Sequence, residues 1–585
     1  MKKYSGNPVS PGIAFGKALV YLDNNTSEIP CYSIQKNQLD AEWNRYLSAN
    51  NEAIEELKAL NAQAKRDMSN EDAGIFEAHL MMLEDTEFQG QIKGRLETSL
   101  QNIEWVIRDI SHEISAMLMA SLDTYLQERT VDVVDVLRRL MNKLLHVQRV
   151  SLADLSEDVI LVCHELLPSD ALTMNKARVK AIVMDMGGAT SHTAILARAF
   201  EIPALAGLSS ASEEINTGDM LIVNGVSGEL IVNPEKSVQT MAEHEWKRYY
   251  KRLGELGELR GLPAETRDGY RVSLKANIEI SEEAEATLRA GCDGIGLYRS
   301  EFLFLAAGRL TDEEEQFKAY SHVLKTMGNL PVTLRTADAG GDKLLPELGL
   351  SDERNPLLGW RAIRFSLSRP EILKTQLRAM LRAGVSGNLR IMFPMISGIE
   401  ELEQALAVLE EAKSELRKQG KVFAEAVPVG IMIEIPSAAL TADILAEKSD
   451  FFSIGTNDLV QYTIAVDRGN EKVSYLAQPF HPAILRSLKR IIDAAHEKGI
   501  TAAMCGEMAG NASFTALLLG LGLDEFSMNV PAIPHVKQVI RSVTKESCGR
   551  LAKNALGCTS YRDVSSLVED WTRSELDISY LSGGL

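Results

Sequence analysis

An alternation of short apolar segments with longer helical stretches constrains the fold of this chain more than any other feature. Between about residues 265 and 540, eight such segments are separated by stretches of helical composition, for example 399–419. Eight strand-and-helix units in a region of this size match a (β/α)8 barrel, although a doubly wound sheet has the same local pattern. The eight segments are RVSLKANI, GIGLYRS, PVTLRTAD, LRIMFPM, VGIMIEIP, FFSIGTND, TAAMCGE and EFSMN.

A proline-free zone nearer the start of the chain predicts several antiparallel helices. No proline occurs between Pro30 and Pro168, and apolar residues recur three and four positions apart within about 36–147. Leu39, Trp43, Leu47 and Ile54 show this spacing.

The zone from about 148 to 235 alternates short strands with turns. DVILVC and KAIVMD predict strands, and GDMLIVNGVSGELIVNP predicts a hairpin because two apolar runs flank a Gly-bearing turn. The charged stretch 237–259 predicts a long connecting helix. We therefore predict an α/β multidomain protein in which residues 1–20 with 148–235 form one domain, 21–147 an inserted all-helical domain, 236–262 a linker helix and 263–585 the barrel.

Composition excludes several classes of protein. With 81 acidic and 62 basic residues, the net charge of −19 argues against nucleic acid as the main partner. The six cysteines form no CxxC pair, which excludes zinc knuckles and a disulfide scaffold and favours a reducing compartment. No apolar stretch approaches the ~18 residues that span a bilayer, and we see no signal peptide. We predict a cytoplasmic protein without membrane contact.

Polar residues gather at the C-terminal ends of the predicted barrel strands, where barrel enzymes place their active sites. Arginine forks suit phosphate and carboxylate, so several of them together predict a small, multiply charged anion as ligand. Strand-end polar residues that are merely solvated are the alternative for each single position. The candidates are Arg299, Arg335, Arg361, Glu434, Asn457, Asp458, Arg468 and Cys505.

Two of these candidates are carboxylates from neighbouring strands. Glu434 and Asp458 offer hard oxygen ligands with room for water, which suits Mg²⁺, and a structural salt bridge is the alternative. Mg²⁺ together with arginines predicts phosphoryl transfer. Cys505 is either an inert core thiol or a proton donor or nucleophile at the site.

A histidine in the zone 148–235 stands in a setting that suits an anion. His192 lies in the segment GGATSHT at the start of a predicted helix, where unpaired N–H groups and the helix dipole favour negative charge. Such an imidazole can accept a phosphoryl group, whereas a capping or packing histidine is the alternative.

With these residues placed, the chain resembles the phosphoenolpyruvate–protein phosphotransferases, Enzyme I of the bacterial sugar phosphotransferase system, over nearly its full length. The resemblance implies a swivelling phosphohistidine domain beside the helical domain and the barrel. The motifs that carry it are SPGIAFGKAL, IFEAHLMMLED, GGATSHTAILAR, GIGLYRSEFLF, RTADAGGDK, NPLLGWRAIR, FFSIGTNDLVQYTIAVDRGN and MCGEMAG.

The resemblance also implies roles for single residues. It implies that His192 is phosphorylated, that Cys505 protonates the departing enolate to give pyruvate, and that Arg361 stabilises the phosphoryl group. Phosphoenolpyruvate binding is implied for Arg299, Arg335, Asn457, Asp458 and Arg468, and Mg²⁺ binding for Glu434 and Asp458. The implied partners are phosphoenolpyruvate, the phosphocarrier protein HPr at the helical domain, and a second copy of the chain at the barrel.

Two departures from the family pattern accompany the resemblance. Ala189 stands where the family often has Arg, and Leu167 where it commonly has Thr. The second change removes a hydroxyl that can orient the phosphorylatable imidazole. Both leave the nucleophile in place and bear on the rate of transfer and the identity of the carrier.

Three alternatives remain at this point. A pyruvate–phosphate dikinase or phosphoenolpyruvate synthase needs a nucleotide-binding domain, for which the helical zone is too short and lacks a Gly-rich phosphate loop. The nitrogen-related paralogue carries an extra N-terminal sensory domain, which we do not expect because SPGIAFG stands so near the start. A protein that only senses phosphoenolpyruvate does not need the nucleophile, metal ligands and proton donor together.

Overall fold

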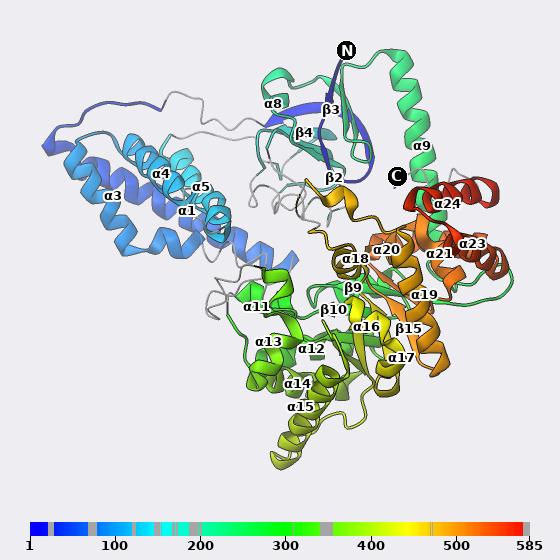
Figure 1. The fold of residues 1–585 in the computed structure, drawn as a ribbon. Helices are drawn as coiled ribbons and strands as arrows, with labels where there is room; N and C mark the ends of the chain where they lie inside the picture. The colour runs from blue at the N-terminus through cyan, green and yellow to red at the C-terminus, as the bar shows by residue number, and fades with distance from the viewer. Residues whose placement is uncertain are drawn as a thin grey trace. The chain divides into compact units, whose positions relative to one another are not determined.

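The structure of the 585-residue chain is a computed structural model. It describes residues 1–21, 29–67, 76, 79–119, 124–145, 152–153, 155–166, 170, 174–186, 197, 200, 202–307, 309–339, 355–467, 470 and 472–576. His192 and Arg468 lie outside these residues, as do Leu167 and Ala189. The chain divides into two compact units, Met1–Arg252 and Leu253–Leu585, and each is described by itself (Figure 1).

The first unit contains an eight-stranded mixed sheet. Its strands are β1 (Lys2–Ser5), β2 (Asn7–Ser10), β3 (Ile13–Tyr21), β4 (Val159–Cys163), β5 (Val179–Met184), β6 (Ala204–Ala206), β7 (Met220–Asn224) and β8 (Glu229–Val232). They lie in the order β1-β8-β7-β3-β4-β5-β6-β2, with β3 to β6 parallel and the others antiparallel. β4 is buried along its whole length, as expected for a parallel strand covered on both faces. The predicted strands and the β7–β8 hairpin are therefore confirmed.

Helices form the rest of the first unit. They are α1 (Leu39–Asp67), α3 (Thr86–Ser99), α4 (Ile103–Met119), α5 (Thr124–Leu144) and the short α8 (Ala211–Glu214), while the connector α9 (Lys236–Glu258) begins in this unit and ends in the second. Residues 79–84 are also helical. The Asp85 side chain caps α3 by accepting from the backbone N–H of Glu87 at 2.7 Å. Met81 is 67% exposed whereas Leu83 is fully buried, so the apolar run 80–83 is partly core.

The second unit is a closed barrel of eight parallel strands, which confirms the (β/α)8 prediction and excludes the doubly wound sheet. The strands are β9 (Ser273–Ile278), β10 (Ile295–Arg299), β11 (Pro331–Arg335), β12 (Asn388–Phe393), β13 (Val429–Ile433), β14 (Phe451–Ile454), β15 (Thr501–Met504) and β16 (Glu525–Met528). β16 pairs with β9 and closes the ring. Each predicted apolar segment coincides with one of these strands, although β12 begins one residue before its segment.

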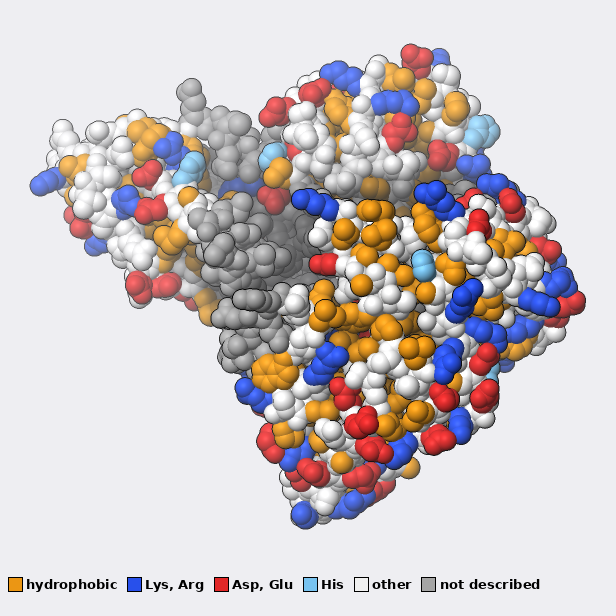
Figure 2. All heavy atoms as spheres, in the orientation of Figure 1, with side chains coloured by type: hydrophobic (Ala, Val, Ile, Leu, Met, Phe, Trp, Pro, Cys, Tyr) orange, Lys and Arg blue, Asp and Glu red, His pale blue; other side chains and the backbone are white. Residues whose placement is uncertain are grey.

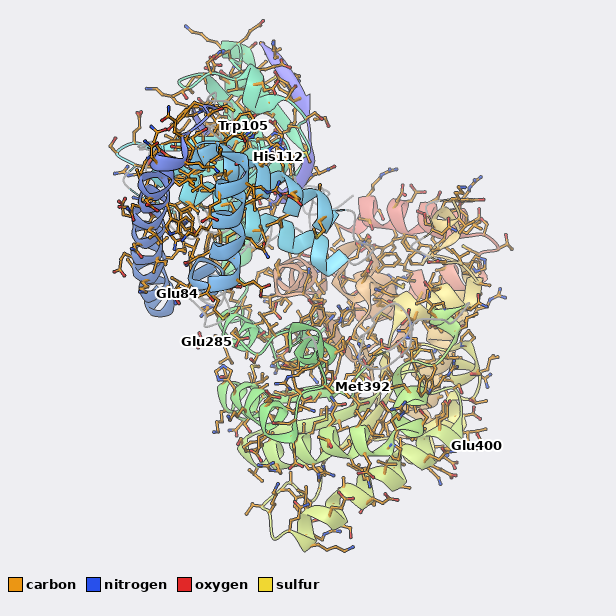
Figure 3. The ribbon with its side chains drawn as sticks, turned by 90° about the vertical axis from the view of Figure 1, so that its left-hand side faces the viewer. Glu84, Trp105, His112, Glu285, Met392 and Glu400 are labelled. Carbon is orange, nitrogen blue, oxygen red and sulfur yellow. The ribbon has the colours of Figure 1, made fainter. Side chains whose placement is uncertain are left out.

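An outer layer of helices surrounds the strands. They are α10 (Glu283–Arg289), α11 (Glu301–Ala307), α12 (Glu313–Met327), α13 (Ala362–Ser368), α14 (Pro370–Ala383), α15 (Ile399–Lys418), α16 (Pro436–Leu440), α17 (Ala442–Leu445), α18 (Thr456–Ile464), α19 (Pro482–Glu497), α20 (Glu507–Gly510), α21 (Ala512–Leu521), α22 (Ile533–Ser542), α23 (Lys545–Gly557) and α24 (Tyr561–Glu575). Figure 3 shows Met392 of β12 inside this unit and Glu285 and Glu400 on the outer helices. The apolar faces of the helices and strands form one continuous core.

A small group of charges lies near the amino-terminal ends of the barrel strands. Lys275 Nζ lies 2.7 Å from Glu525 Oε2, and Arg390 Nη1 lies 3.0 Å from the same oxygen. The Arg390 guanidinium also stacks over the Phe451 ring at 3.9 Å. The side chain of Lys275 is only 1% exposed. We call Lys275, Glu525 and Arg390 the floor cluster.

One face of the barrel unit mixes charged and hydrophobic side chains (Figure 2). On the face shown in Figure 2, acidic and basic side chains are interspersed over the outer helices. In the described part of the chain, no helix combines the length and the apolar character needed to cross a membrane.

Candidate active site

The carboxyl-terminal ends of the barrel strands surround a cavity of about 280 Å³. This is the end of the barrel at which enzymes of this architecture carry out their chemistry. Seven of the residues predicted from the sequence line it: Arg299, Arg335, Arg361, Glu434, Asn457, Asp458 and Cys505. The other two, His192 and Arg468, lie outside the described residues.

The strand ends place most of these side chains. Arg299 and Arg335 are the last residues of β10 and β11, and the two face each other in the strand register. Glu434 directly follows β13, and Cys505 directly follows β15. Asn457 and Asp458 were predicted to end β14, but that strand stops at Ile454 and both residues lie in the first turn of α18.

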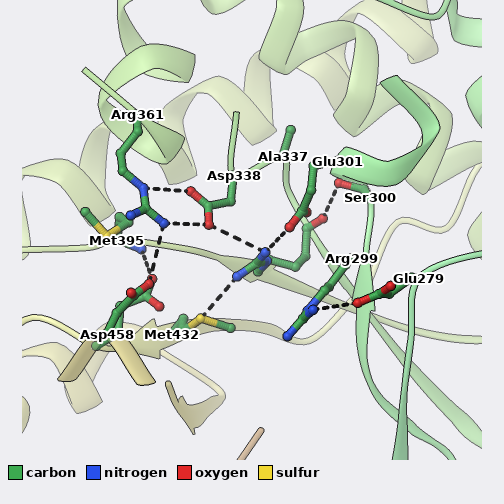
Figure 4. Close-up of polar contacts among 12 residues, drawn as sticks. Glu279, Arg299, Ser300, Glu301, Ala337, Asp338, Arg361, Met395, Met432 and Asp458 are labelled. Atoms are coloured by element: carbon green, nitrogen blue, oxygen red, sulfur yellow. Dashed lines mark hydrogen bonds and ion pairs between the residues drawn. The ribbon is translucent and has the colours of Figure 1, made fainter. Parts of the chain in front are cut away.

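Buried ion pairs hold two of the arginines. Arg335 is 5% exposed, and its guanidinium bonds the Glu301 carboxylate and lies 3.6 Å from Asp338 Oδ2 (Figure 4). Asp338, 2% exposed, receives a two-pronged bond from Arg361, with Nε at 3.1 Å and Nη2 at 2.8 Å. Although burial opposes ionisation, these carboxylates raise the pKa of both arginines. These ion pairs therefore keep the guanidinium groups of Arg335 and Arg361 charged and fix their orientation in the cavity.

The backbone around Arg361 is also constrained. Ala362 directly follows it, is fully buried and has a φ of 52°, a left-handed conformation that is strained for a residue with a Cβ. Its N–H donates to the carbonyl of Ala339 at 2.9 Å. Arg361 Nη2 also reaches Asp458 Oδ2 at 3.5 Å, so this arginine connects two walls of the cavity.

On the more open side of the cavity, two candidate ligands contact carboxylates of the protein itself. Arg299 Nη1 lies 2.6 Å from Glu279 Oε1, and both side chains are partly exposed. Asn457 Nδ2 donates to Glu507 Oε1 at 2.7 Å, while the Glu507 N–H donates to Asn457 Oδ1 at 3.0 Å. An anionic ligand of Arg299 competes with Glu279 for the same donor.

The environment of Glu434 bears on whether the site fits a metal ion. Burial, and then repulsion by Asp458 and Asp338, raise its pKa to about 8, although its Oε1 accepts a bond from the Met395 N–H at 2.7 Å. No group of three His, Cys, Asp or Glu side chains spaced for a metal occurs within the described ranges. Mg²⁺ commonly takes one or two carboxylates and completes its shell with water and substrate phosphate. The neighbouring carboxylates Glu434 and Asp458 therefore fit Mg²⁺.

Cys505 lies at the bottom of the cavity. Its thiol is buried against Leu297, Met392, Met432 and Phe451. Burial raises the pKa of this thiol, although Ser453, Arg335 and Arg299 act in the opposite direction. The thiol therefore holds its proton, which suits an acid more than a nucleophile.

Reasoning from the sequence missed the acidic partners of the arginines. The missed residues are Glu279, Glu301, Asp338 and Glu507. Each lies within three residues of a strand end, since Glu279 directly follows β9 and Asp338 is three residues beyond β11. Applying the strand-end rule to carboxylates as strictly as to arginines finds all four.

Comparison with protein families gives three matches along the chain. The PEP-binding domain of the PEP-utilising enzymes matches residues 254–545, their N-terminal domain matches 5–129 and their mobile domain matches 155–228. The matched ranges include the barrel strands with their cavity, the helices α1, α3 and α4, and the strands β2 to β7 of the mixed sheet. The fold and the cavity therefore define a phosphoenolpyruvate-utilising enzyme.

Curated relatives narrow this class. A phosphoenolpyruvate-protein phosphotransferase of Haemophilus influenzae is 43% identical over 97% of this chain and 98% of its own, and one of Staphylococcus carnosus is 41% identical over 98% and 100%. A solved structure of Enzyme I (nEIt) is 34% identical over 42% of this chain and 99% of its own, with a TM-score of 0.37. On the strength of the curated relatives, the chain belongs to the phosphoenolpyruvate-protein phosphotransferase family. It is an enzyme of phosphoenolpyruvate-dependent phosphotransfer.

Proposed function

We propose that this enzyme transfers the phosphoryl group of phosphoenolpyruvate to its own His192 and then to the phosphocarrier protein HPr, with release of pyruvate. The observation that carries the proposal is the convergence of Arg299, Arg335 and Arg361 with Glu434 and Asp458 on one small cavity. Such a constellation suits an anion with both a carboxylate and a phosphate.

In this proposal the arginines hold the donor. Arg335 and Arg361 are buried and oriented by carboxylates, so little reorganisation accompanies binding. Arg299 exchanges Glu279 for the ligand, and Asn457 and Arg468 complete the set. When bound by Glu434 and Asp458, Mg²⁺ neutralises charge on the phosphate and on the departing enolate.

Cys505 supplies the proton in the same step. The P–O bond of phosphoenolpyruvate breaks while a P–N bond forms at Nε2 of His192, and the enolate departs. The S–H bond of Cys505 then breaks and a C–H bond forms at the methylene carbon, which gives pyruvate. Arg335 and Arg299 stabilise the thiolate that remains, because both lower the pKa of this group.

His192 belongs by sequence to the first unit, whereas the cavity belongs to the second. Transfer therefore requires His192 to visit the cavity and then the carrier, with α9 as the connection along which this motion occurs. The four-part domain organisation, a homodimer through the barrel and a cytoplasmic location belong to the same proposal.

The helical region is the proposed docking surface for HPr. Met81 is the exposed member of the apolar run, and the neighbouring Glu84 is also exposed and is labelled in Figure 3. Leu83 lies in the core, so its replacement tests folding instead of docking. Met81→Asp is the appropriate variant, and we expect slower transfer to HPr with self-phosphorylation unchanged.

One labelling experiment tests the proposal. The protein is incubated with Mg²⁺ and ³²P-labelled phosphoenolpyruvate, with and without HPr, and the label is mapped. We expect label on His192, its passage to HPr, and no label in the His192→Ala protein. Label on another residue of that variant would refute the assignment of His192 as the nucleophile. Binding of phosphoenolpyruvate without release of pyruvate would indicate a sensor. Formation of ATP from AMP would indicate a dikinase or synthase.

A further inference from the structure

A glutamine outside the cavity makes contacts that bear on the substrate site. Gln376 lies on the outer helix α14, is 3% exposed and does not line the cavity. Its Oε1 accepts the Ala337 N–H at 2.8 Å, and its Nε2 donates to Ser300 Oγ and Tyr320 OH, each at 3.0 Å. Both ends of this buried amide are therefore bonded.

One of these bonds ends on the segment that carries Arg335 and Asp338, and a second reaches this segment through Ser300. Ala337 lies between Arg335 and Asp338. Ser300 Oγ donates in turn to the Arg335 carbonyl at 2.7 Å (Figure 4). The last regular bond from this strand to its neighbour is made by the Thr336 N–H, which donates to the Met392 carbonyl at 3.0 Å. The next backbone N–H, that of Ala337, donates to the side chain of Gln376.

A shift of this segment reaches both buried arginines. Arg335 bonds Glu301 next to Ser300, and Asp338 holds the guanidinium of Arg361. The carbonyl of Ala339 also accepts from Ala362, the residue after Arg361. Because an error of about 1 Å in a catalytic group can reduce rates about a hundredfold, a brace at Ala337 matters for function.

We propose that Gln376 is a positioning residue for the phosphoenolpyruvate site, acting through Ala337 and Ser300 on Arg335 and Asp338. The inference rests on the proposed function, since the arginines are taken as ligands of the substrate. Gln376 itself touches no substrate.

The chain contains a matched control for this proposal. Gln316 on α12 is equally buried and bonds the same tyrosine, because Tyr320 OH lies 3.3 Å from its Oε1, while its Nε2 donates to the Thr311 carbonyl at 2.9 Å. It contacts neither Ala337 nor Ser300. Replacing either glutamine by methionine keeps the length of the side chain and removes its hydrogen bonds.

The test compares Gln376→Met with Gln316→Met in steady-state formation of pyruvate with HPr, together with thermal unfolding. We expect both variants to lose similar stability, and Gln376→Met alone to raise KM for phosphoenolpyruvate about tenfold. An unchanged KM in folded Gln376→Met overturns the proposal, as does an equal rise in Gln316→Met. An inactive wild-type protein contradicts the proposed function instead.

A second pair of variants applies if Gln376→Met does not fold. Gln376→Glu keeps the acceptor for the Ala337 N–H and removes the donors, and Ser300→Ala removes only the link to the Arg335 carbonyl. We expect KM to rise about threefold in each. A KM equal to that of the wild type in both variants overturns the proposal.

Discussion

At the amino ends of the barrel strands, Lys275 and Arg390 both contact Glu525, whereas at the carboxyl ends Glu434 lies among other carboxylates. The pKa of Glu525 is lowered, because Lys275 and Arg390 outweigh its burial. The pKa of Glu434 is raised to about 8 by burial and by Asp458 and Asp338. Both carboxylates are buried in the same barrel, but among the described residues only Glu525 of the two forms direct ion pairs with cations of the protein. Arg335 lowers the pKa of Glu434 without outweighing its burial and the two aspartates.

The difference separates charges that stabilise the fold from charges that await a ligand. In the floor cluster, two cations share one carboxylate, although burial still lowers the pKa of Lys275. Around the cavity, Glu434 and Asp458 repel each other until a cation lies between them. We therefore expect substitutions in the floor cluster to reduce stability and substitutions around the cavity to reduce activity.

Among these substitutions, Glu434→Gln is expected to have the largest effect on activity. Loss of a metal ligand should reduce the rate of pyruvate formation about a thousandfold or more. The free energy of unfolding should stay equal or rise, because the amide is neutral without the proton that the buried carboxyl takes up on folding, and it can still accept from the Met395 N–H. Initial rates and urea unfolding measure the two effects, and a folded variant with a tenth of normal activity contradicts the assignment.

Glu525→Gln should show the opposite pattern. Lys275 and Arg390 then remain buried without their carboxylate, which should lower the free energy of unfolding by about 3 kcal/mol. The value of kcat/KM for the molecules that remain folded should stay within about threefold of normal. Urea unfolding gives the first number, and the double variant Lys275→Met with Glu525→Gln should recover part of the loss. A large loss of activity without a loss of stability would reverse the roles of the two ends.

Cys505→Ala removes an uncharged group from the cavity, and its effect can be compared with the effects of removing charged groups there. We expect binding of phosphoenolpyruvate to persist and release of pyruvate to fall about a hundredfold, since proton delivery to carbon is lost. Burst measurements with labelled phosphoenolpyruvate separate binding from turnover. Full turnover in this variant would leave Cys505 as a core residue only.

Glu313 extends the comparison to the outer layer and should have the smallest effect. Burial opposes its ionisation, but bonds from Arg378, Lys421 and Arg382 lower its pKa to about 2 from an ordinary 4.5. A lowered pKa stabilises the fold above pH 4.5 and loses this effect as the pH falls towards 2. Glu313→Gln should therefore cost about 1–2 kcal/mol at pH 7, after allowance for solvent screening, and less below pH 4.5.

Urea unfolding of the wild type and this variant between pH 3 and 7 measures that difference. Glu410→Gln is a control, because Glu410 is exposed and pairs only along its own helix with Lys413. We expect it to change the free energy of unfolding by less than about 0.5 kcal/mol at any of these pH values. A pH-independent difference for Glu313→Gln would show that its charge is not the cause.

The barrel could be predicted from the sequence because a parallel strand buried on both faces is a short apolar run between helices. The same rule located Arg299, Arg335, Glu434 and Cys505 at strand ends. It misplaced Asn457 and Asp458 by one helical turn, because Gly455 ends the extended backbone before them. Periodicity specifies which face a residue occupies, but not the residue at which a strand becomes a helix.

The contacts that orient the site could not be predicted in the same way. The pairing of Asp338 with Arg361 joins residues 23 apart in the chain, and Gln376 reaches Ala337 from a separate helix. In the sequence, Gln376 is one polar residue on an otherwise amphipathic helix, and nothing in its spacing distinguishes it from a solvated one. Only the packing of α14 against the strand ends gives it a partner.

The floor cluster has a consequence for protein engineering. Lys275, Arg390 and Glu525 each lie three residues before the last residue of their strands, which separates the floor cluster from the strand ends by roughly 10 Å. Mutations that far apart usually add without interference. A library that randomises the mouth of the barrel for new donor molecules can thus leave Lys275, Glu525 and Arg390 untouched as an anchor for the scaffold.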